Sequence, residues 1–82
     1  MKSSNDRLDS EERNELPYSD FGIPETREFP MPDAAHVRAA EAYFRYAPEQ
    51  YRGELARRIL KKAEKFGVGV KSPTVLEWAQ KG

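Results

Sequence analysis

The chain has one histidine, His36, which follows Asp33 by three residues. In a helix this spacing places an imidazole beside a carboxylate, a pairing that serves acid–base catalysis or metal binding. A metal ion would need further ligands from elsewhere, and nothing in the spacing selects any of the 14 acidic residues for that role. We therefore expect His36 to be a structural residue in the first turn of a helix that Asp33 caps.

Other candidate catalytic groups lack the neighbours that their chemistry needs. Ser19 precedes Asp20 without the flanking glycines of a nucleophile elbow. Gly67 and Gly69 do not continue directly into the Lys-Ser/Thr pair of a phosphate-binding loop. The chain has no cysteine, so a thiol nucleophile, a disulfide and a thiolate-bound zinc ion are excluded. The sequence therefore predicts a protein that is not an enzyme and carries no cofactor or metal.

Five basic residues are crowded at spacings of one, three or four along one polar segment: Arg57, Arg58, Lys61, Lys62 and Lys65. On a helix they would spread over one broad face, and such a face could bind the phosphates of a nucleic acid. The same face could instead bind a protein partner or simply be exposed to solvent, because Glu54 and Glu64 lower its positive charge. The pattern alone leaves these three interpretations open.

The charges are divided unevenly along the chain. Residues 1–33 hold four basic and nine acidic residues, whereas residues 34–82 hold ten and five. Apart from Met1, residues 1–15 contain one large apolar side chain, Leu8, so we expect a disordered acidic arm there. No signal segment or membrane span is apparent, so we expect a cytoplasmic protein with no membrane partner. Residues 16–82 suffice for one small domain with a thin core.

A first helix is predicted at about residues 34–46. Pro30 and Pro32 prevent an earlier start, and Asp33 can cap the helix by accepting a hydrogen bond from a free backbone amide. Apolar residues then recur three and four apart, which indicates one buried face: Val37, Ala40, Phe44 and Ala47, with Tyr43 beside them.

Two further helices are predicted at about residues 48–66 and 73–80. The longer one begins at Pro48 and ends before Gly67, and Gly53 inside it suggests close contact with another element. The shorter one follows Ser72, a good N-terminal cap. Its apolar residues should close over the other two helices: Val75, Leu76 and Trp78.

Residues 16–32 combine prolines with large apolar side chains, unlike a free linker. Phe21 and Ile23 alternate, as do Phe29 and Met31, so each pair would point one way from an extended strand. The intervening Pro-Glu-Thr-Arg supplies a turn. We therefore predict a mainly α fold: a small three-helix domain with an extended, proline-rich clasp or short β-hairpin packed on the helices, and with Phe21 and Phe29 largely buried.

The clasp and the start of the first helix contain an ordered string of motifs: Leu16-Pro17, Phe21-x-Ile23-Pro24, Arg27, Phe29-Pro30, and Asp33 followed by His36-Val37-Arg38. This string resembles the signature of a small domain of unknown function found in bacteriophages, prophages and mobile elements. That domain occurs as short free-standing proteins and as a segment of larger phage head-related polypeptides. The resemblance covers residues 16 to about 66 and includes no established catalytic residues.

The resemblance implies an accessory domain of a phage or mobile element that binds another protein. Its signature residues would be structural, and its location would be the host cytoplasm or a virion. The alternative is a small nucleic-acid-binding domain that uses the basic residues at 57–65. The partner and the oligomeric state are not predicted.

Overall fold

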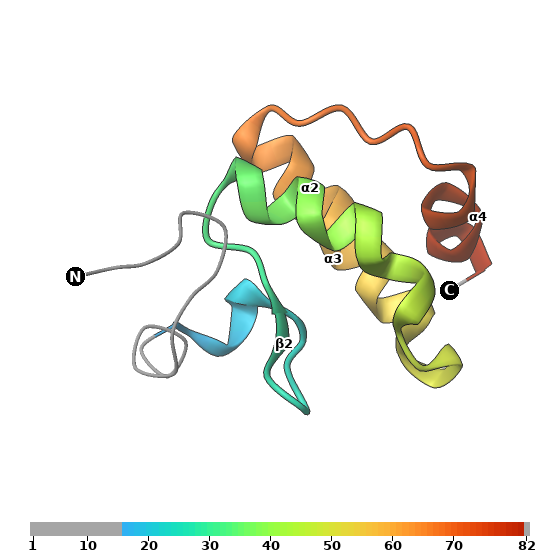
Figure 1. Cartoon of the computed structure of the whole chain (residues 1–82), viewed down its shortest axis with the longest axis horizontal. Helices are drawn as coiled ribbons and strands as arrows, with labels where there is room; N and C mark the ends of the chain where they lie inside the picture. The colour runs from blue at the N-terminus through green and yellow to red at the C-terminus, as the bar shows by residue number, and fades with distance from the viewer. Residues whose placement is uncertain (1–15, 82) are drawn as a thin grey trace.

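The computed structural model describes residues 16–81 (Figure 1). Residues 1–15, for which the sequence predicts a disordered arm, and Gly82 lie outside the described residues. The elements within this range are η1 (Tyr18–Asp20), β1 (Phe21–Ile23), β2 (Glu28–Pro30), α2 (Ala34–Tyr43), η2 (Phe44–Tyr46), α3 (Glu49–Phe66) and α4 (Pro73–Lys81), where η marks a 3-10 turn. The predicted fold class is confirmed: three helices carry a short two-stranded hairpin.

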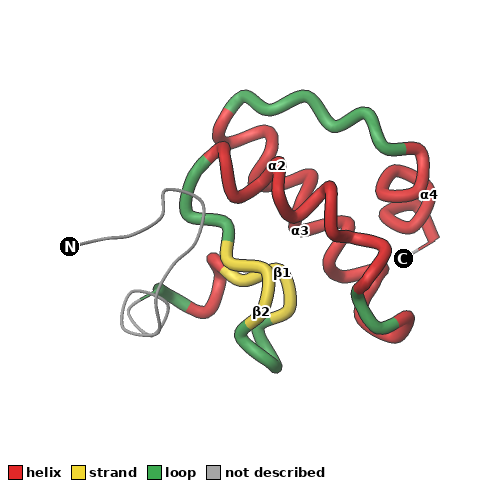
Figure 2. Tube along the Cα trace, in the orientation of Figure 1, coloured by secondary structure: helices red, strands yellow, loops and turns green. Residues whose placement is uncertain are grey.

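The predicted clasp is an antiparallel hairpin (Figure 2). Phe21 pairs with Pro30 and Ile23 with Glu28. The amide of Thr26 donates to the carbonyl oxygen of Ile23 at 3.3 Å, so the proline between them occupies the second position of the turn, as predicted. The hairpin is short because prolines cannot donate to a longer ladder.

Gly22, in the middle of β1, lies directly against helix α3. A Cβ atom at this position would be 2.3 Å from Cδ1 of Leu55 and 3.0 Å from Cβ of Phe29. Real Cβ atoms essentially never show a distance as short as the first, and the second is tighter than most real Cβ contacts. A side chain at residue 22 would therefore force Leu55 or the hairpin to shift.

Helix α2 begins where the sequence predicts. Asp33 accepts a hydrogen bond from the backbone amide of His36 at 2.9 Å, which satisfies one of the free donors of the first turn. The α-helix ends at Tyr43, three residues before the predicted end, and the chain tightens into η2. Ala47 then adopts an extended conformation with ψ 145° because it precedes a proline.

Helix α3 is the central element, in contact with α2, the hairpin and α4. It begins at Glu49, directly after Pro48, and ends at Gly67, whose φ of 72° is the left-handed conformation of a helix C-terminal cap. The close contact predicted at Gly53 is not found. A Cβ atom there would meet only Arg57 Nη1 at 3.5 Å and the backbone oxygen of Trp78 at 3.9 Å.

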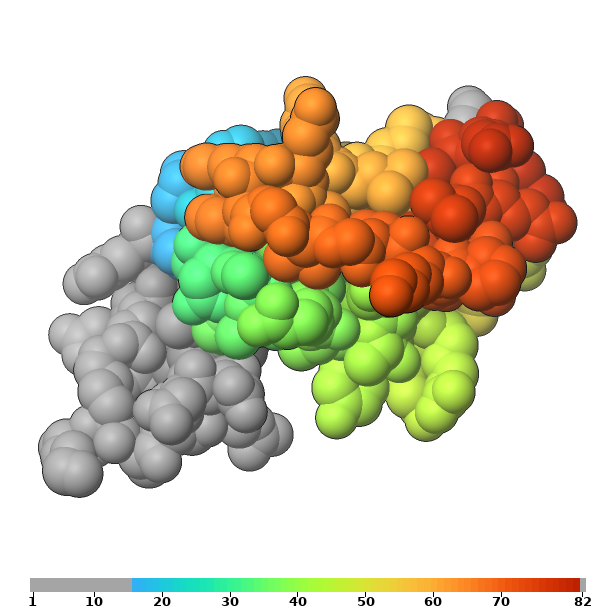
Figure 3. All heavy atoms as spheres, turned by 90° about the horizontal axis from the view of Figure 1, so that it is seen from above, coloured from blue at the N-terminus to red at the C-terminus, as the bar shows by residue number. Residues whose placement is uncertain are grey.

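The connector at residues 68–72 crosses the molecule to α4 (Figure 3). The carboxylate of Glu41, on α2, accepts hydrogen bonds from the amides of Lys71 and Ser72 at 3.0 and 2.9 Å. The hydroxyl of Ser72 accepts from the amide of Val75 at 3.3 Å, which confirms the predicted cap of α4. The end of the connector is thus held by α2 while α4 packs on α3.

The core is formed by all three helices and the hairpin, and its buried apolar residues are Phe21, Ile23, Met31, Val37, Ala40, Phe44, Ala47, Leu55, Ala56, Ile59, Ala63 and Val75. Phe21 is fully buried as predicted, whereas Phe29 is only partly buried. The prediction that Leu76 closes over the other two helices is wrong. Val75 takes the inward position of the short α4, and the side chain of Leu76, the next residue, is exposed.

Within residues 16–81 no helix is long and apolar enough to cross a membrane.

Two glycine substitutions should have opposite effects on stability. We expect Gly22→Ala to lower the free energy of unfolding by about 1–3 kcal/mol, because the methyl group must displace Leu55. We expect Gly53→Ala to raise it by about 0.5–1 kcal/mol, since alanine is the better helix former and its methyl group meets no close atom. Urea unfolding of both variants measures these changes, and a stable Gly22→Ala variant would contradict the close contact.

Candidate functional site

The five basic residues that the sequence predicts to form one face lie on two different sides of helix α3. Arg57, Lys61 and Lys65 are exposed and follow one another at intervals of four residues, so they form one row along the helix. We call these three residues the basic row. Arg58 and Lys62 are less exposed and are bound to the N-terminal part of the domain.

Arg58 and Lys62 hold the hairpin and η1 against α3. Arg58 Nε donates to the carboxylate of Glu54 at 3.1 Å, and its Nη1 donates to the carbonyl oxygen of Phe21 at 3.5 Å. Lys62 forms an ion pair with Asp20, and the side chains of the pair are 13% and 19% exposed. Two of the five basic residues are therefore already engaged in contacts that stabilise the fold.

The Asp33–His36 pair lies at the start of α2 as a cap. Nδ1 of His36 lies 2.7 Å from Oδ1 of Asp33, the same oxygen that accepts the backbone amide of His36. Partial burial acts to raise the pKa of Asp33, but its hydrogen bonds with the His36 side chain and amide, and the charge of His36, lower that pKa below its ordinary value. The imidazole is buried, and its Nε2 has no hydrogen-bond partner among the described residues.

The surroundings of this pair can be compared with the ligand set that a metal ion needs. Among residues 16–81, no three His, Asp or Glu side chains are grouped closely enough to hold a metal ion. The hydrogen bond from the His36 amide to Asp33 places the pair in the N-terminal cap of α2.

The signature residues are divided between the core and the surface. Phe21, Ile23, Pro24, His36 and Val37 are buried; Leu16, Arg27, Phe29 and Pro30 are partly buried; Pro17, Asp33 and Arg38 are exposed. The guanidinium of Arg27 lies over the ring of Phe21 at 4.5 Å from its centroid. Most of the signature residues therefore lie in the hairpin and at the start of α2.

A pair of tyrosines is exposed where α2 passes into η2. Tyr43 is 59% exposed and Tyr46 is 67% exposed, and their ring centroids are 6.1 Å apart. The yellow-green segment that contains them protrudes from the body of the domain (Figure 3). The prediction that Tyr43 packs beside the core is wrong, because the next residue, Phe44, takes the inward position and turns Tyr43 toward solvent. We call Tyr43 and Tyr46 the tyrosine pair.

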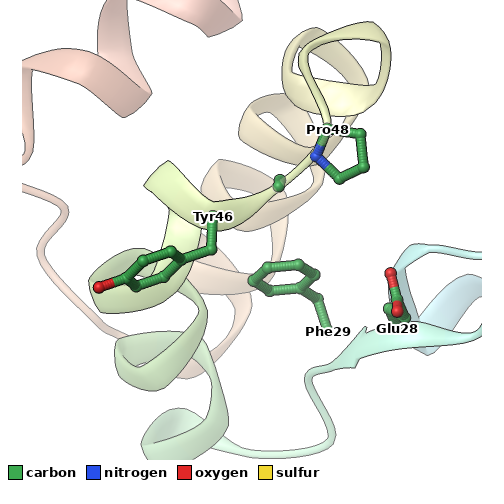
Figure 4. Close-up of a pocket in the computed structure, with 5 residues that line it drawn as sticks. Glu28, Phe29, Tyr46 and Pro48 are labelled. Carbon is green, nitrogen blue, oxygen red and sulfur yellow. The ribbon is translucent and has the colours of Figure 1, made fainter.

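An open pocket of about 370 Å³ lies beside Tyr46, between the hairpin and the start of α3. Five residues line it: Glu28, Phe29, Tyr46, Ala47 and Pro48. In Figure 4 the ring of Phe29 lies between Tyr46 and Glu28, and the hydroxyl of Tyr46 points away from Phe29. We call this feature the aromatic pocket.

Phe29 reaches the pocket through an unusual backbone conformation. Its φ is 59°, in the left-handed region that costs a residue with a side chain about 1–2 kcal/mol. The predicted alternation of Phe29 with Met31 is therefore broken: Met31 is fully buried, whereas Phe29 packs partly on the core and partly lines the pocket. A conformation of this kind persists only where the surrounding structure holds it.

Arg52 holds the turn that carries Tyr46. Its Nε donates to the carbonyl oxygen of Ala47 at 2.9 Å and its Nη2 to that of Arg45 at 3.0 Å. Its guanidinium lies 5.9 Å from the ring centroid of Trp78 on α4. The pocket wall formed by η2 is thus supported by α3 and, through Arg52, by α4.

The sequence contains no pattern that marks the pocket residues as a site. Glu28, Phe29, Tyr46 and Pro48 lie in two segments separated by the whole of α2, and no spacing rule connects them. One signal was present in the sequence: two large aromatic residues, Tyr43 and Tyr46, near the end of an amphipathic helix whose inward positions other residues already fill.

Comparison with known proteins identifies no relative for this chain. Searches with protein-family models, among curated proteins and among solved structures each gave no match.

The two sides of α3 should respond differently to alanine substitution. We expect Lys62→Ala to lower the free energy of unfolding by about 1–3 kcal/mol, because the mostly buried carboxylate of Asp20 loses its charged partner. Lys61→Ala, the control on the exposed row, should change it by less than about 0.5 kcal/mol. Urea unfolding measures both values, and equal effects would show that Lys62 does not hold η1 on α3.

Proposed function

We propose that this chain is a non-enzymatic accessory domain of a phage or other mobile genetic element and that it binds a protein partner. The proposal of a phage or mobile-element origin is supported by the motif string at residues 16–38. The proposed location is the host cytoplasm, or a virion if the partner is a structural component.

The observation that carries the binding proposal is the exposed tyrosine pair beside the aromatic pocket. Tyrosine is enriched among the residues that dominate protein interfaces, since its ring buries a large area and loses little conformational entropy. Here Tyr43 and Tyr46 are both more than half exposed on a protruding segment. Leaving two such rings in water has no packing benefit for the isolated domain, whereas a partner would gain their burial.

The surface around Tyr46 is also held in place by contacts within the domain itself. Arg52 fixes two carbonyl groups of the turn around Tyr46. Arg45 donates to the hydroxyl of Tyr46 at 3.3 Å and lies over its ring at 5.1 Å from the centroid. A preorganised surface loses less entropy on binding, which favours recognition of a specific partner.

Loss of the tyrosine pair should strongly weaken partner binding. We expect tagged full-length protein to recover a specific protein from cells that carry the parent element. Replacing Tyr43 and Tyr46 by serine should weaken binding of that protein by about 30-fold or more, as expected for a loss of about 2 kcal/mol at an interface centre.

Tyr18→Ser is the matched control, since Tyr18 is 60% exposed but lies on η1. Partner recovery is measured by quantitative mass spectrometry, and circular dichroism checks that each variant is folded. Equal recovery by the double variant and the wild type would exclude the tyrosine pair as the binding surface.

Nucleic-acid binding is the second candidate, and the basic row supports it. Arg57, Lys61 and Lys65 are exposed along one line of α3, where they could contact successive phosphates. Exposed Glu64 lies next to Lys65 and reduces the local charge. The row has three cations, fewer than the five that the sequence suggested, and this makes nucleic acid the weaker candidate.

Salt dependence tests this second candidate. If the basic row binds DNA or RNA, log K should fall with log salt with a slope of about −0.9 for each phosphate contacted, or about −0.7 on single strands. Reversing Arg57, Lys61 and Lys65 to glutamate should remove binding, whereas Lys71→Glu, also exposed but outside the row, should have little effect. Arg58 and Lys62 are left unchanged because their loss would disturb the fold. Binding that is absent or independent of salt would exclude the candidate.

A further inference from the structure

We propose that the aromatic pocket binds a basic side chain of the protein partner, and arginine in preference to lysine. This inference rests on the proposed protein-binding function and specifies the chemistry of the residue that the partner inserts. It follows from the combination of two ring faces, a carboxylate and an open cavity at one place.

The walls of the pocket suit a cation. Phe29 and Tyr46 present aromatic rings, whose faces carry partial negative charge and attract ammonium and guanidinium groups. Glu28 supplies a full negative charge on the same cavity. Its Oε1 accepts a hydrogen bond from the hydroxyl of Thr26 at 3.1 Å, which helps to position the carboxylate.

Glu28 also disfavours an uncharged occupant. An apolar side chain that filled the cavity would remove water from the carboxylate without giving it a partner, and this desolvation is unfavourable. A basic side chain would fill the same space and pair with the carboxylate. Glu49, which directly follows the pocket residue Pro48, adds a second exposed negative charge nearby.

The basic residues near the pocket already have contacts within the domain. Arg45 donates to the hydroxyl of Tyr46, the end of that ring which points away from Phe29. Arg52 is bound to the two carbonyl groups of the turn. Arg27 lies over the ring of Phe21.

Arginine fits these walls better than lysine. A planar guanidinium can stack on an aromatic face while its edge donates hydrogen bonds to a carboxylate. The protein itself provides an example on a ring that lines the pocket, since the Arg45 guanidinium lies over the Tyr46 ring. A lysine ammonium would gain the charge pairing but not the stacking.

The left-handed conformation of Phe29 is consistent with such a role. Without it, the expected alternation would turn the ring toward the same side as Met31 and away from the pocket. The conformation is unfavourable for the isolated backbone and places the ring on the cavity.

The test is a titration of the full-length protein with single-residue probes, followed by NMR. The probes are the N-acetyl methylamides of arginine, lysine and citrulline, because citrulline has nearly the shape of arginine without its charge. We expect the arginine probe to shift the resonances of Glu28, Phe29 and Tyr46. The citrulline probe should bind about fivefold more weakly or worse, since it lacks the charge that the rings and carboxylate attract.

Two glutamate variants separate this site from general charge attraction. Glu28→Gln should weaken binding of the arginine probe about fivefold, whereas Glu25→Gln, an exposed residue of the same hairpin, should leave it unchanged. No saturable shifts at Glu28, Phe29 and Tyr46, equal binding of citrulline, or equal effects of the two variants would overturn the proposal. Tighter binding of lysine would overturn the preference for arginine.

The same variants distinguish this inference from the proposed function. If the tyrosine double variant loses the partner and Glu28→Gln also loses it, both proposals are supported. If Glu28→Gln keeps the partner at full affinity, the domain binds protein through the tyrosine pair but the pocket does not receive a basic side chain.

Discussion

The close packing of the hairpin on helix α3 is the contact on which the rest of the structure depends. Each strand has three residues, and a hairpin of that size is not stable in water by itself. Its backbone approaches Leu55 at Gly22, its Phe21 carbonyl accepts from Arg58, and the preceding turn is held by the Asp20–Lys62 pair. These three contacts all lie along one side of α3, so the hairpin and the helix form one unit.

This packing also determines which surfaces remain for binding. Because α3 uses Arg58 and Lys62 to hold the hairpin, only the three residues of the basic row remain exposed among the five basic residues at positions 57–65. Because the hairpin is fixed, the left-handed turn of the chain at Phe29 brings that ring to the start of α3. The same contact therefore weakens the nucleic-acid interpretation and creates one wall of the aromatic pocket.

The opposite end of the domain supports the other wall. Glu41 holds the connector, α4 packs on α3, and Trp78 lies near the guanidinium that fixes the η2 turn. The pocket is thus assembled from segments that are distant in the chain, each held by contacts of its own. Such a surface suits recognition of a partner better than an exposed flexible peptide would, because little ordering is needed when the partner binds.

Local patterns in the sequence were enough to predict the three helices, the Asp33 and Ser72 caps, the turn at Pro24 and most of the core. These features depend on apolar spacing and on backbone preferences of proline, glycine and capping residues, which are local properties. Tertiary contacts are responsible for the exposure of Tyr43, for the position of Phe29 between the core and the pocket, and for the division of the five basic residues. Those outcomes depend on partners such as Asp20, 42 residues from Lys62, and no local rule relates residues at that distance.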